Sequence, residues 1–326
     1  MNELLKYFLV TQMIAIINQF KVAPRYVLDK YFVKNKEGKL SASLQIPIYK
    51  GSGVILSSVS EDGKHLIQDD GDKFLLDLTI PRFPLVKNIP ASELNSIASL
   101  DGKKEQLQSL SQRIGEIVGE HKNSFVTTLE YMATGALFGK VVDGKGKTLF
   151  EFKNSTGAVV SKSGVKLVQT LNQIEEKLEA ELGFIPPYEI LASRSYIDGI
   201  AALADEEKLF EKGTASWEEE NGRRVFIVHG KKFVPYSATY KNTKGVTKKF
   251  IEDNKAIVTP LTNEVYKLLY TRANHVEAQK LAPKLFFSAT PEKLPRGAGW
   301  EIVSEMRAIP VCVRPGALIN LEYQAS

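Results

Sequence analysis

The stretch GKVVDGKGKT, residues 139–148, comes nearest to a chemical motif in this sequence. A phosphate-binding loop has the pattern GxxxxGK[ST], in which glycines let backbone N–H groups approach phosphate and the last hydroxyl holds magnesium. Counting forward from Gly139 leaves Gly146 where the hydroxyl belongs. Counting back from Thr148 leaves Val141 where the first glycine belongs. Each register therefore fails at one position.

The surroundings of residues 139–148 also differ from those of a phosphate loop. Such a loop joins a strand to a helix, whereas this stretch follows a helical pattern and leads into the alternating run TLFEF. Asp-Gly and Lys-Gly between two β-prone runs are typical of a tight turn with positive φ angles. We predict a β-hairpin here, and a nucleotide-binding enzyme using residues 139–148 is the unfavoured alternative.

Residue types that bind metals are present but scattered. The four histidines have neither an i, i+4 partner nor the cysteine spacing of a zinc site, and they are His65, His121, His229 and His275. Asp69, Asp70 and Asp72 lack the closing glutamate of a calcium loop. We expect satisfied or solvent-facing histidines and a solvated acidic turn.

The single cysteine, Cys312, excludes an intrachain disulfide and a cysteine-based zinc cluster, which fits a reducing compartment. It lies in the apolar run IPVCV, which predicts a buried thiol. No GxSxG motif occurs. We therefore predict no catalytic, cofactor-binding or metal-binding residues, no cofactor and no enzymatic activity.

Composition indicates a folded globular protein, with 326 residues of which 43% are hydrophobic and 25% charged. A net charge of +5 spread over 43 basic and 38 acidic residues does not predict a sequence-specific nucleic-acid interface. The apolar N-terminal run is too short to span a membrane, and we expect a cytoplasmic chain. Its spacing predicts an amphipathic helix that docks on this subunit or another, with an apolar face formed by Leu5, Leu9, Met13, Ile16 and Phe20.

The elements that follow have unusual proportions. Strand patterns in residues 40–59 and 74–80, with turn signals at EDGK and QDDGDK between them, predict a long projecting hairpin. Three prolines in residues 81–90 are expected to break regular structure. Residues 103–138 predict one very long helix, with a stripe formed by Leu107, Leu110, Ile114, Ile117, Phe125, Met132 and Ala136.

The second half of the chain predicts a mixed α/β block. Helices are expected at residues 165–183 and 194–210 around a buried strand at 188–193, with β-structure from 223 to 259. The run Glu218–Glu220 is expected to be a solvated loop, with Trp217 beside it as a candidate partner contact. Residues 300–323 predict one or two strands bent at Pro310 and Pro315.

These proportions favour an assembling protein over a compact monomer. Isolated hairpins are marginally stable in water, and an extended N-terminal helix and an over-long helix also need a surface to bury. Extended elements obtain such a surface from neighbouring subunits in closed assemblies. The overall class is α+β.

The order of several segments resembles the lambda-type major capsid protein E family of tailed bacteriophages. The segments are APRYVLDKYF (23–32), TIPRFPLVKNIPASEL (79–94), TTLEYMATGALFGKVVDGKGKTLFEF (127–152) and YSATYKNTKGVTKKFIEDNKAIVTP (236–260). Glu252 departs from the family pattern, which often has proline there. The terminal run RAIPVCVRPGALINLEY is also similar to the closing strand of this fold.

The resemblance implies a phage major capsid fold of the Hong Kong-ninety-seven-like type. Mapped onto this sequence, residues 1–44 would form the N-arm and residues 45–82 the extended E-loop hairpin. Residues 83–155 and 265–310 would form the peripheral domain around the long spine helix. Residues 156–264 and 311–326 would form the axial domain.

The implied function is a major capsid protein that self-assembles into pentamers and hexamers and encloses phage DNA in an icosahedral head. The resemblance implies a separate scaffolding protein, a portal, a possible decoration protein and nonspecific contact with packaged DNA, without membrane association. It places the chain in the virion, and in the host cytoplasm during assembly. A cargo-holding protein nanocompartment of the same fold is the nearer alternative.

Overall fold

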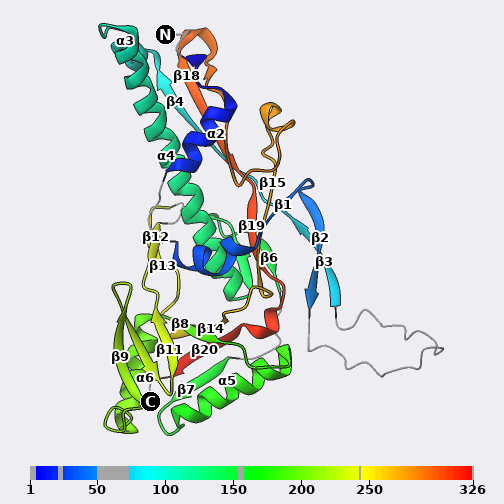
Figure 1. The fold of residues 1–326 in the computed structure, drawn as a ribbon, viewed down its shortest axis with the longest axis vertical. Coiled ribbons are helices and arrows are strands. Elements are labelled where there is room, and N and C mark those ends of the chain that lie inside the picture. The colour runs from blue at the N-terminus through cyan, green and yellow to red at the C-terminus, as the bar shows by residue number, and fades with distance from the viewer. Residues whose placement is uncertain (1–4, 21–24, 50–72, 153–157, 242–243, 325–326) are drawn as a thin grey trace, which may run out of the picture. The chain divides into compact units, whose positions relative to one another are not determined.

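The computed structural model describes residues 5–20, 25–49, 73–152, 158–241 and 244–324 (Figure 1). The predicted residues 54–59, the EDGK turn and most of the QDDGDK turn lie outside this part, as do His65, Asp69, Asp70 and Asp72. The chain forms two compact units, made of Met1–Leu44, Thr79–Met132 and Leu268–Pro310, and of Gln45–Leu78, Ala133–Lys267 and Val311–Ser326. Helices and strands are mixed in both, which confirms the α+β class.

The long helix is confirmed as α4, Lys103–Leu137, with 35 residues. At 1.5 Å per residue it is about 50 Å long. Six of the seven predicted stripe residues are buried, and Leu107 at the start of the stripe is half-buried. A stripe with three- and four-residue spacing therefore gives this helix one continuous apolar face.

In the first unit, α4 lies against an antiparallel sheet. The strands are β4 (Phe83–Pro90), β18 (Gly299–Met306), β16 (Phe286–Ser288) and β17 (Glu292–Lys293), with β18 pairing to the other three. The short helix α3 (Ala91–Ala98) follows β4. A second sheet has the order β1 (Lys36–Lys39), β15 (Tyr266–Thr271) and β19 (Ala308–Cys312).

The prediction that residues 81–90 break regular structure is wrong, because most of them form β4. In the described chain β4 pairs with β18 alone. Backbone N–H groups on the other edge of β4 therefore have no partner strand to bond among the described residues. The Ala91 N–H bonds to Ala298 O at 3.1 Å. Because N–H directions alternate along a strand, Pro84 and Pro90 fall at positions whose nitrogens face away from β18. Prolines at these positions remove no ladder hydrogen bond.

The N-terminal helix is α2, Val10–Gln19, and its buried face differs from the prediction. Leu9 has extended backbone angles and is 55% exposed, because the helix begins one residue later. Met13 and Ile17 are buried, while Ile16 is half-buried. Val10 and Ile14 pack against a cluster of Ala278, Phe287 and Ala289. The helix therefore docks within this subunit.

Two short helical turns, η1 (Leu28–Phe32) and η2 (Val33–Asn35), lead from the N-terminal segment into β1. Leu28, Tyr31 and Phe32 are buried. After α2, this segment is therefore the second part of the N-terminal region that buries apolar side chains.

The second unit contains a mixed sheet with the strand order β7, β20, β14, β8, β11, β10 and β9. These strands are Val159–Lys162, Ile319–Gln324, Lys255–Pro260, Tyr188–Ala192, Lys231–Pro235, Arg223–Val228 and Ala215–Glu220. Every residue of β8 is buried, which confirms the predicted buried strand.

The two predicted helices of this unit are confirmed as α5 (Leu167–Leu182) and α6 (Arg194–Glu206). α5 ends at Gly183, whose φ of 79° is the left-handed conformation that glycine adopts at helix C-termini. α6 begins at Ser193, whose hydroxyl accepts a bond from the Tyr196 N–H. These local signals explain why both helices were predictable.

Three two-stranded ribbons complete the part of the fold that the structure describes. β2 (Ser43–Tyr49) pairs with β3 (Lys73–Thr79), and β12 (Thr239–Lys241) pairs with β13 (Thr247–Lys249). β5 (Lys140–Val142) pairs with β6 (Thr148–Glu151), which confirms the predicted hairpin.

The prediction of a loop at Glu218–Glu220 is wrong, because these residues complete β9. β9 is the last strand of its sheet, and charged side chains are common on edge strands because they discourage pairing with other chains. Trp217 is half-buried, with its ring 4.9 Å from that of Phe226 and 4.2 Å from the Arg224 guanidinium. Its contact with a partner stays a prediction.

The C-terminal run forms three strands, β18, β19 and β20, where one or two were predicted. The first break is at Arg307, where the chain leaves the partners of β18 and joins β15. Pro310 lies inside β19, which is the edge strand of its sheet and tolerates a missing donor. The expected break at Pro315 is confirmed, because this residue begins the helical turn η5, Pro315–Ala317.

A glycine in α4 tests how closely the following hairpin approaches this helix. A Cβ added at Gly135 would lie 2.5 Å from Lys140 O, so Gly135→Ala should force β5 away and lower the free energy of unfolding by about 1–3 kcal/mol. The measurement is the urea midpoint followed by circular dichroism. The control Gly115→Ala, whose Cβ would lie 3.6 Å from the Phe20 ring, should be neutral or stabilising by up to about 1 kcal/mol. Equal effects of the two substitutions would contradict this packing.

Candidate functional site

The turn at residues 139–148 does not form a phosphate site. Asp143 Oδ1 accepts the Lys145 N–H at 2.9 Å and the Lys147 N–H at 2.8 Å. Gly146 has a φ of 85°, as the turn requires. Backbone donors that a phosphate loop would offer are thus occupied by a carboxylate, whose charge would repel phosphate. The nucleotide-binding interpretation of this stretch is therefore wrong.

The described histidines do not gather into a metal centre. His121 is buried in the first unit, His229 lies in a turn with a φ of 47°, and His275 Nε2 is 3.7 Å from Glu292. Over the described ranges, no group of three or more His, Cys, Asp or Glu residues could hold a metal ion. The described helices include none that is long and apolar enough to cross a membrane.

Cys312 is fully buried in β19, as predicted. Burial raises the pKa of its thiol well above the ordinary value, because the thiolate would lose its hydration. The thiol therefore stays protonated and unreactive at neutral pH.

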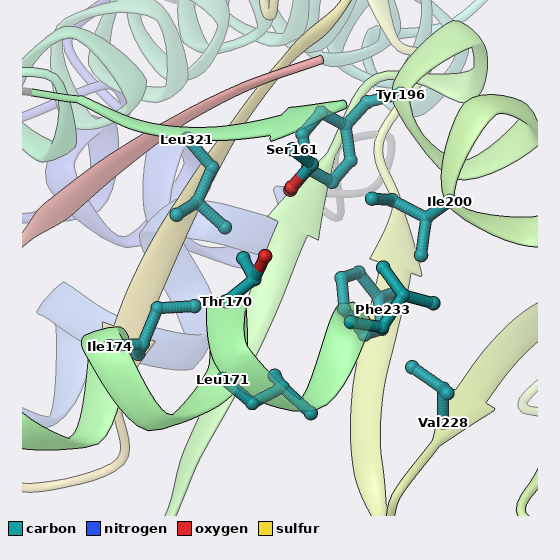
Figure 2. Close-up of a pocket in the computed structure, with 10 residues that line it drawn as sticks. Ser161, Thr170, Leu171, Ile174, Tyr196, Ile200, Val228, Phe233 and Leu321 are labelled. Atoms are coloured by element: carbon teal, nitrogen blue, oxygen red, sulfur yellow. The ribbon is translucent and has the colours of Figure 1, made fainter. Parts of the chain in front are cut away.

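Figure 2 shows a small cavity between α5, α6 and the sheet of the second unit. Its volume is about 10 Å³, and its lining is mostly apolar, with Leu171, Ile200 and Phe233 among the residues. The hydroxyls of Ser161 and Tyr196 lie 3.2 Å apart at its edge. A cavity of roughly 10–15 Å³ holds a single water molecule, so this one is too small to be a ligand site.

A larger groove of about 340 Å³ lies between α3 and the first turns of α4. Its most basic side chain, Arg113, forms ion pairs with Glu93 and Glu116. Because its charge is already balanced within the groove, Arg113 does not offer an anion site.

Buried polar contacts in the first unit instead position the N-terminal segment. Glu130 is only 3% exposed, and its two carboxylate oxygens accept the Val27 N–H at 2.9 Å and the Leu28 N–H at 2.8 Å. These donors stand at the start of η1, where no helical partner is available to them. Glu130 therefore attaches the N-terminal segment to α4 through charge-assisted hydrogen bonds.

The end of α2 is attached to α4 in a similar way. Lys122 Nζ donates to Asn18 O at 3.0 Å, and a cation near the last carbonyls of a helix is favourable. Burial lowers the pKa of Lys122, and the nearby positive charge of Arg25 lowers it further. The Phe20 ring lies over Gly119, where an added Cβ would be 3.0 Å from the ring. Glycine thus allows close approach of the N-terminal segment.

His121 connects α4 to the sheet. Its Nδ1 is 2.9 Å from Ser304 Oγ, and Ser304 Oγ donates to Ser288 Oγ at 3.1 Å. Burial is the main cause that lowers the pKa of His121, and the positive charge of Lys87 lowers it further. The imidazole is therefore neutral in the folded protein at neutral pH.

Glu305, a second buried carboxylate of the first unit, accepts hydrogen bonds from two connecting segments. Its oxygens accept Arg82 Nε at 2.7 Å and the Asn274 N–H at 2.6 Å. Glu305 is 2% exposed and lies on β18. Together with Glu130, Lys122 and His121 it fixes chain segments that are distant in sequence.

Sequence reasoning did not identify these polar contacts. The spacing gave no clear signal, because Glu130 falls nearly opposite Phe125 and Met132 around the helix and Lys122 falls at the edge of the stripe. Charged residues at such positions usually face solvent, whereas the structure buries both of them. The identity of the partner depends on tertiary structure, so the spacing alone could not supply it.

Substitution of Glu130 tests the attachment of the N-terminal segment. Glu130→Gln keeps one acceptor oxygen but places an NH₂ group against the second N–H, which should cost about 1–3 kcal/mol of unfolding free energy. Faster hydrogen exchange at Val27 and Leu28 should accompany this loss. The control Glu116→Gln, at a side chain that is 51% exposed, should cost less than about 0.5 kcal/mol. Unchanged exchange at Val27 and Leu28 would refute the attachment.

His121 should make stability depend on pH. Because its folded pKa is lowered, the unfolded chain binds more protons just below the ordinary value of 6.5, and stability rises with pH in that window. Acidification from pH 7 to 5 should therefore reduce the unfolding free energy, by at most about 1.4 kcal/mol per pH unit for this proton. His121→Gln should flatten this slope in urea titrations at several pH values. An unchanged slope in the variant would show that another group is responsible.

Comparison with known proteins bears on the whole chain. The family model described as phage major capsid protein E matches residues 10–322. A sequence comparison with curated proteins found no match.

A solved structure shows the same fold. The chain is similar to the putative capsid protein of a prophage from E. coli CFT073, with 13% identity, a TM-score of 0.63, and coverage of 97% of this chain and 99% of that chain. It also aligns with the bacteriophage PhiM1 mature capsid, at 14% identity, a TM-score of 0.48, and coverage of 90% and 87%. The holo-SrpI encapsulin complex from Synechococcus elongatus PCC 7942 aligns at 10% identity with a TM-score of 0.47, and the alignment covers 92% of this chain and 87% of that chain. The last two scores are too low to carry an argument.

The prophage capsid structure, at this low identity, supports the fold alone, and the fold is the Hong Kong-ninety-seven-like capsid fold that the family resemblance implied. The family follows from the sequence model, because its match extends over nearly the whole chain. The chain belongs to the phage major capsid protein E family.

Proposed function

We propose that this chain builds the icosahedral shell of a phage head by assembling into pentamers and hexamers. The observation that carries the proposal is the family match over residues 10–322. The architecture is compatible with it, because the buried side chains of Glu130 and Lys122 hold the N-terminal segment in place. The protein has a geometric role in this account and catalyses no reaction.

The proposal assigns a role to each part of the chain. Residues 1–44 act as the N-arm and residues 45–82 as the E-loop. The E-loop reaches a neighbouring subunit, whereas α2 and η1 of the N-arm are held on their own subunit. Residues 83–155 and 265–310 form the peripheral domain, and residues 156–264 and 311–326 form the axial domain at the centres of the rings. Support comes from the paired strands β2 and β3 at the base of the proposed E-loop and from α4 in the proposed peripheral domain.

The proposed partners follow from the same role. A separate scaffolding protein and a portal take part in assembly in the host cytoplasm, and a decoration protein is an optional addition. Packaged DNA contacts the inner wall without sequence specificity, so salt weakens this contact. During maturation, rigid-body rotation of subunits repacks their interfaces, with the E-loop and α4 as the moving parts.

Electron microscopy of the purified chain tests the proposal. We expect closed shells, or rings of five and six subunits, after expression of the chain with and without its scaffolding protein. Addition of ATP and magnesium should leave the melting temperature unchanged. Particles that never exceed a monomer or dimer, together with thermal stabilisation by ATP and magnesium, would contradict it.

A further inference from the structure

The hairpin β12–β13 carries a concentration of positive charge. Residues 239–249 contain four lysines and no acidic residue. All four lysines are exposed, and no carboxylate in the described chain lies within ion-pair distance of Lys241 or Lys248. Lys249, by contrast, pairs with Asp253 at 2.6 Å. The hairpin therefore presents charges that the subunit itself does not balance.

An aromatic cluster holds this hairpin in place. The Phe250 ring lies 5.0 Å from the Tyr240 ring and 5.7 Å from the Tyr236 ring, and Tyr236 is buried. A two-stranded hairpin is marginally stable on its own, so these ring contacts are needed to order it. The lysines are thus displayed on an ordered element before any partner binds.

The edge strand β9 carries the opposite charge. Glu218, Glu219 and Glu220 are exposed at the outermost position of the sheet. Lys232 Nζ pairs with Glu220 Oε2 at 2.8 Å, and this hydrogen bond is the main cause that raises the pKa of Lys232. Glu218 and Glu219 have no cation within ion-pair distance in the part of the chain that the structure describes.

Both surfaces belong to the second unit, where Figure 1 shows β12–β13 and β9 as separate elements. A ring of identical subunits uses a heterologous interface, in which one patch of each subunit meets a different patch of the next. Such an interface requires two unlike, complementary surfaces on the same chain. The exposed Lys241 and Lys248, like Glu218 and Glu219, form no ion pairs in the described chain, although Glu219 lies opposite Arg224 in the β9–β10 register. They provide two such surfaces.

We propose that the β12–β13 hairpin of one subunit docks against β9 of the next copy of this chain in the same ring, with Lys241 and Lys248 facing Glu218 and Glu219. This inference rests on the proposed function, because it names an interface within the assembled rings. Charge pairing of this kind selects the correct partner and register and accelerates association, since like charges disfavour other arrangements. The acidic edge also keeps free subunits from pairing through β9.

Charge exchange tests the interface. The variant K241E/K248E should lower the assembled fraction at least tenfold in sedimentation velocity, and E218K/E219K should do the same. The four substitutions combined should restore assembly to within about twofold of the wild type. The control K103E/K104E makes the same charge change at exposed residues at the start of α4 and should assemble normally. Melting temperatures of the dissociated subunits show whether each variant folds.

Cross-linking gives a second readout without substitutions. A zero-length carbodiimide reagent joins lysine to carboxylate, and mixed isotopically labelled and unlabelled subunits identify links between copies. We expect intersubunit links from Lys241 or Lys248 to Glu218 or Glu219 in assembled rings, lost on dissociation.

The possible outcomes separate this inference from the proposed function. If the wild type forms rings, two outcomes overturn the docking contact alone. In the first, the double variants assemble normally; in the second, the combined variant does not regain assembly. A K241E/K248E variant that forms normal shells but retains less DNA would assign the hairpin to nucleic acid and also overturns it. A wild type that forms no rings overturns both.

Discussion

Burial of one apolar stripe along α4 is the constraint on which much of the first unit depends. Full burial of each large side chain in this stripe contributes about 1.5–3 kcal/mol, and the stripe extends over most of a 35-residue helix. A hydrogen bond to a charged group, such as those at Glu130, contributes about 1.5–3 kcal/mol. Apolar burial therefore supplies most of the stability. The buried polar groups determine which segments lie against the helix and in what register.

The sequence predicted those features whose signals are local. The repeat of the α4 stripe, Gly183 at the end of α5 and Asp-Gly in the 139–148 turn each determine backbone geometry within a few residues. Prolines 84 and 90 were misread because the effect of a proline depends on which edge of its strand is paired, and that depends on β18. Glu218–Glu220 were misread because edge strands tolerate a composition that resembles a loop.

The candidate site shows the same division between local and tertiary signals. The failed phosphate pattern and the buried thiol of Cys312 could be judged from neighbouring residues. Glu130, Lys122 and His121 could not, because their partners are at residues 27–28, 18 and 304. In a protein with a structural role, these contacts take the place that a catalytic cluster has in an enzyme. They hold chain segments that are distant in sequence against α4 and its sheet.

The central claim is that identical chains close into a shell through rings of five and six. A cryo-electron microscopy reconstruction of the assembled wild-type protein tests it most directly. The account predicts a closed icosahedral shell in which residues 156–264 and 311–326 surround the fivefold and quasi-sixfold axes. A reconstruction with open filaments, or with other residues around those axes, would contradict it.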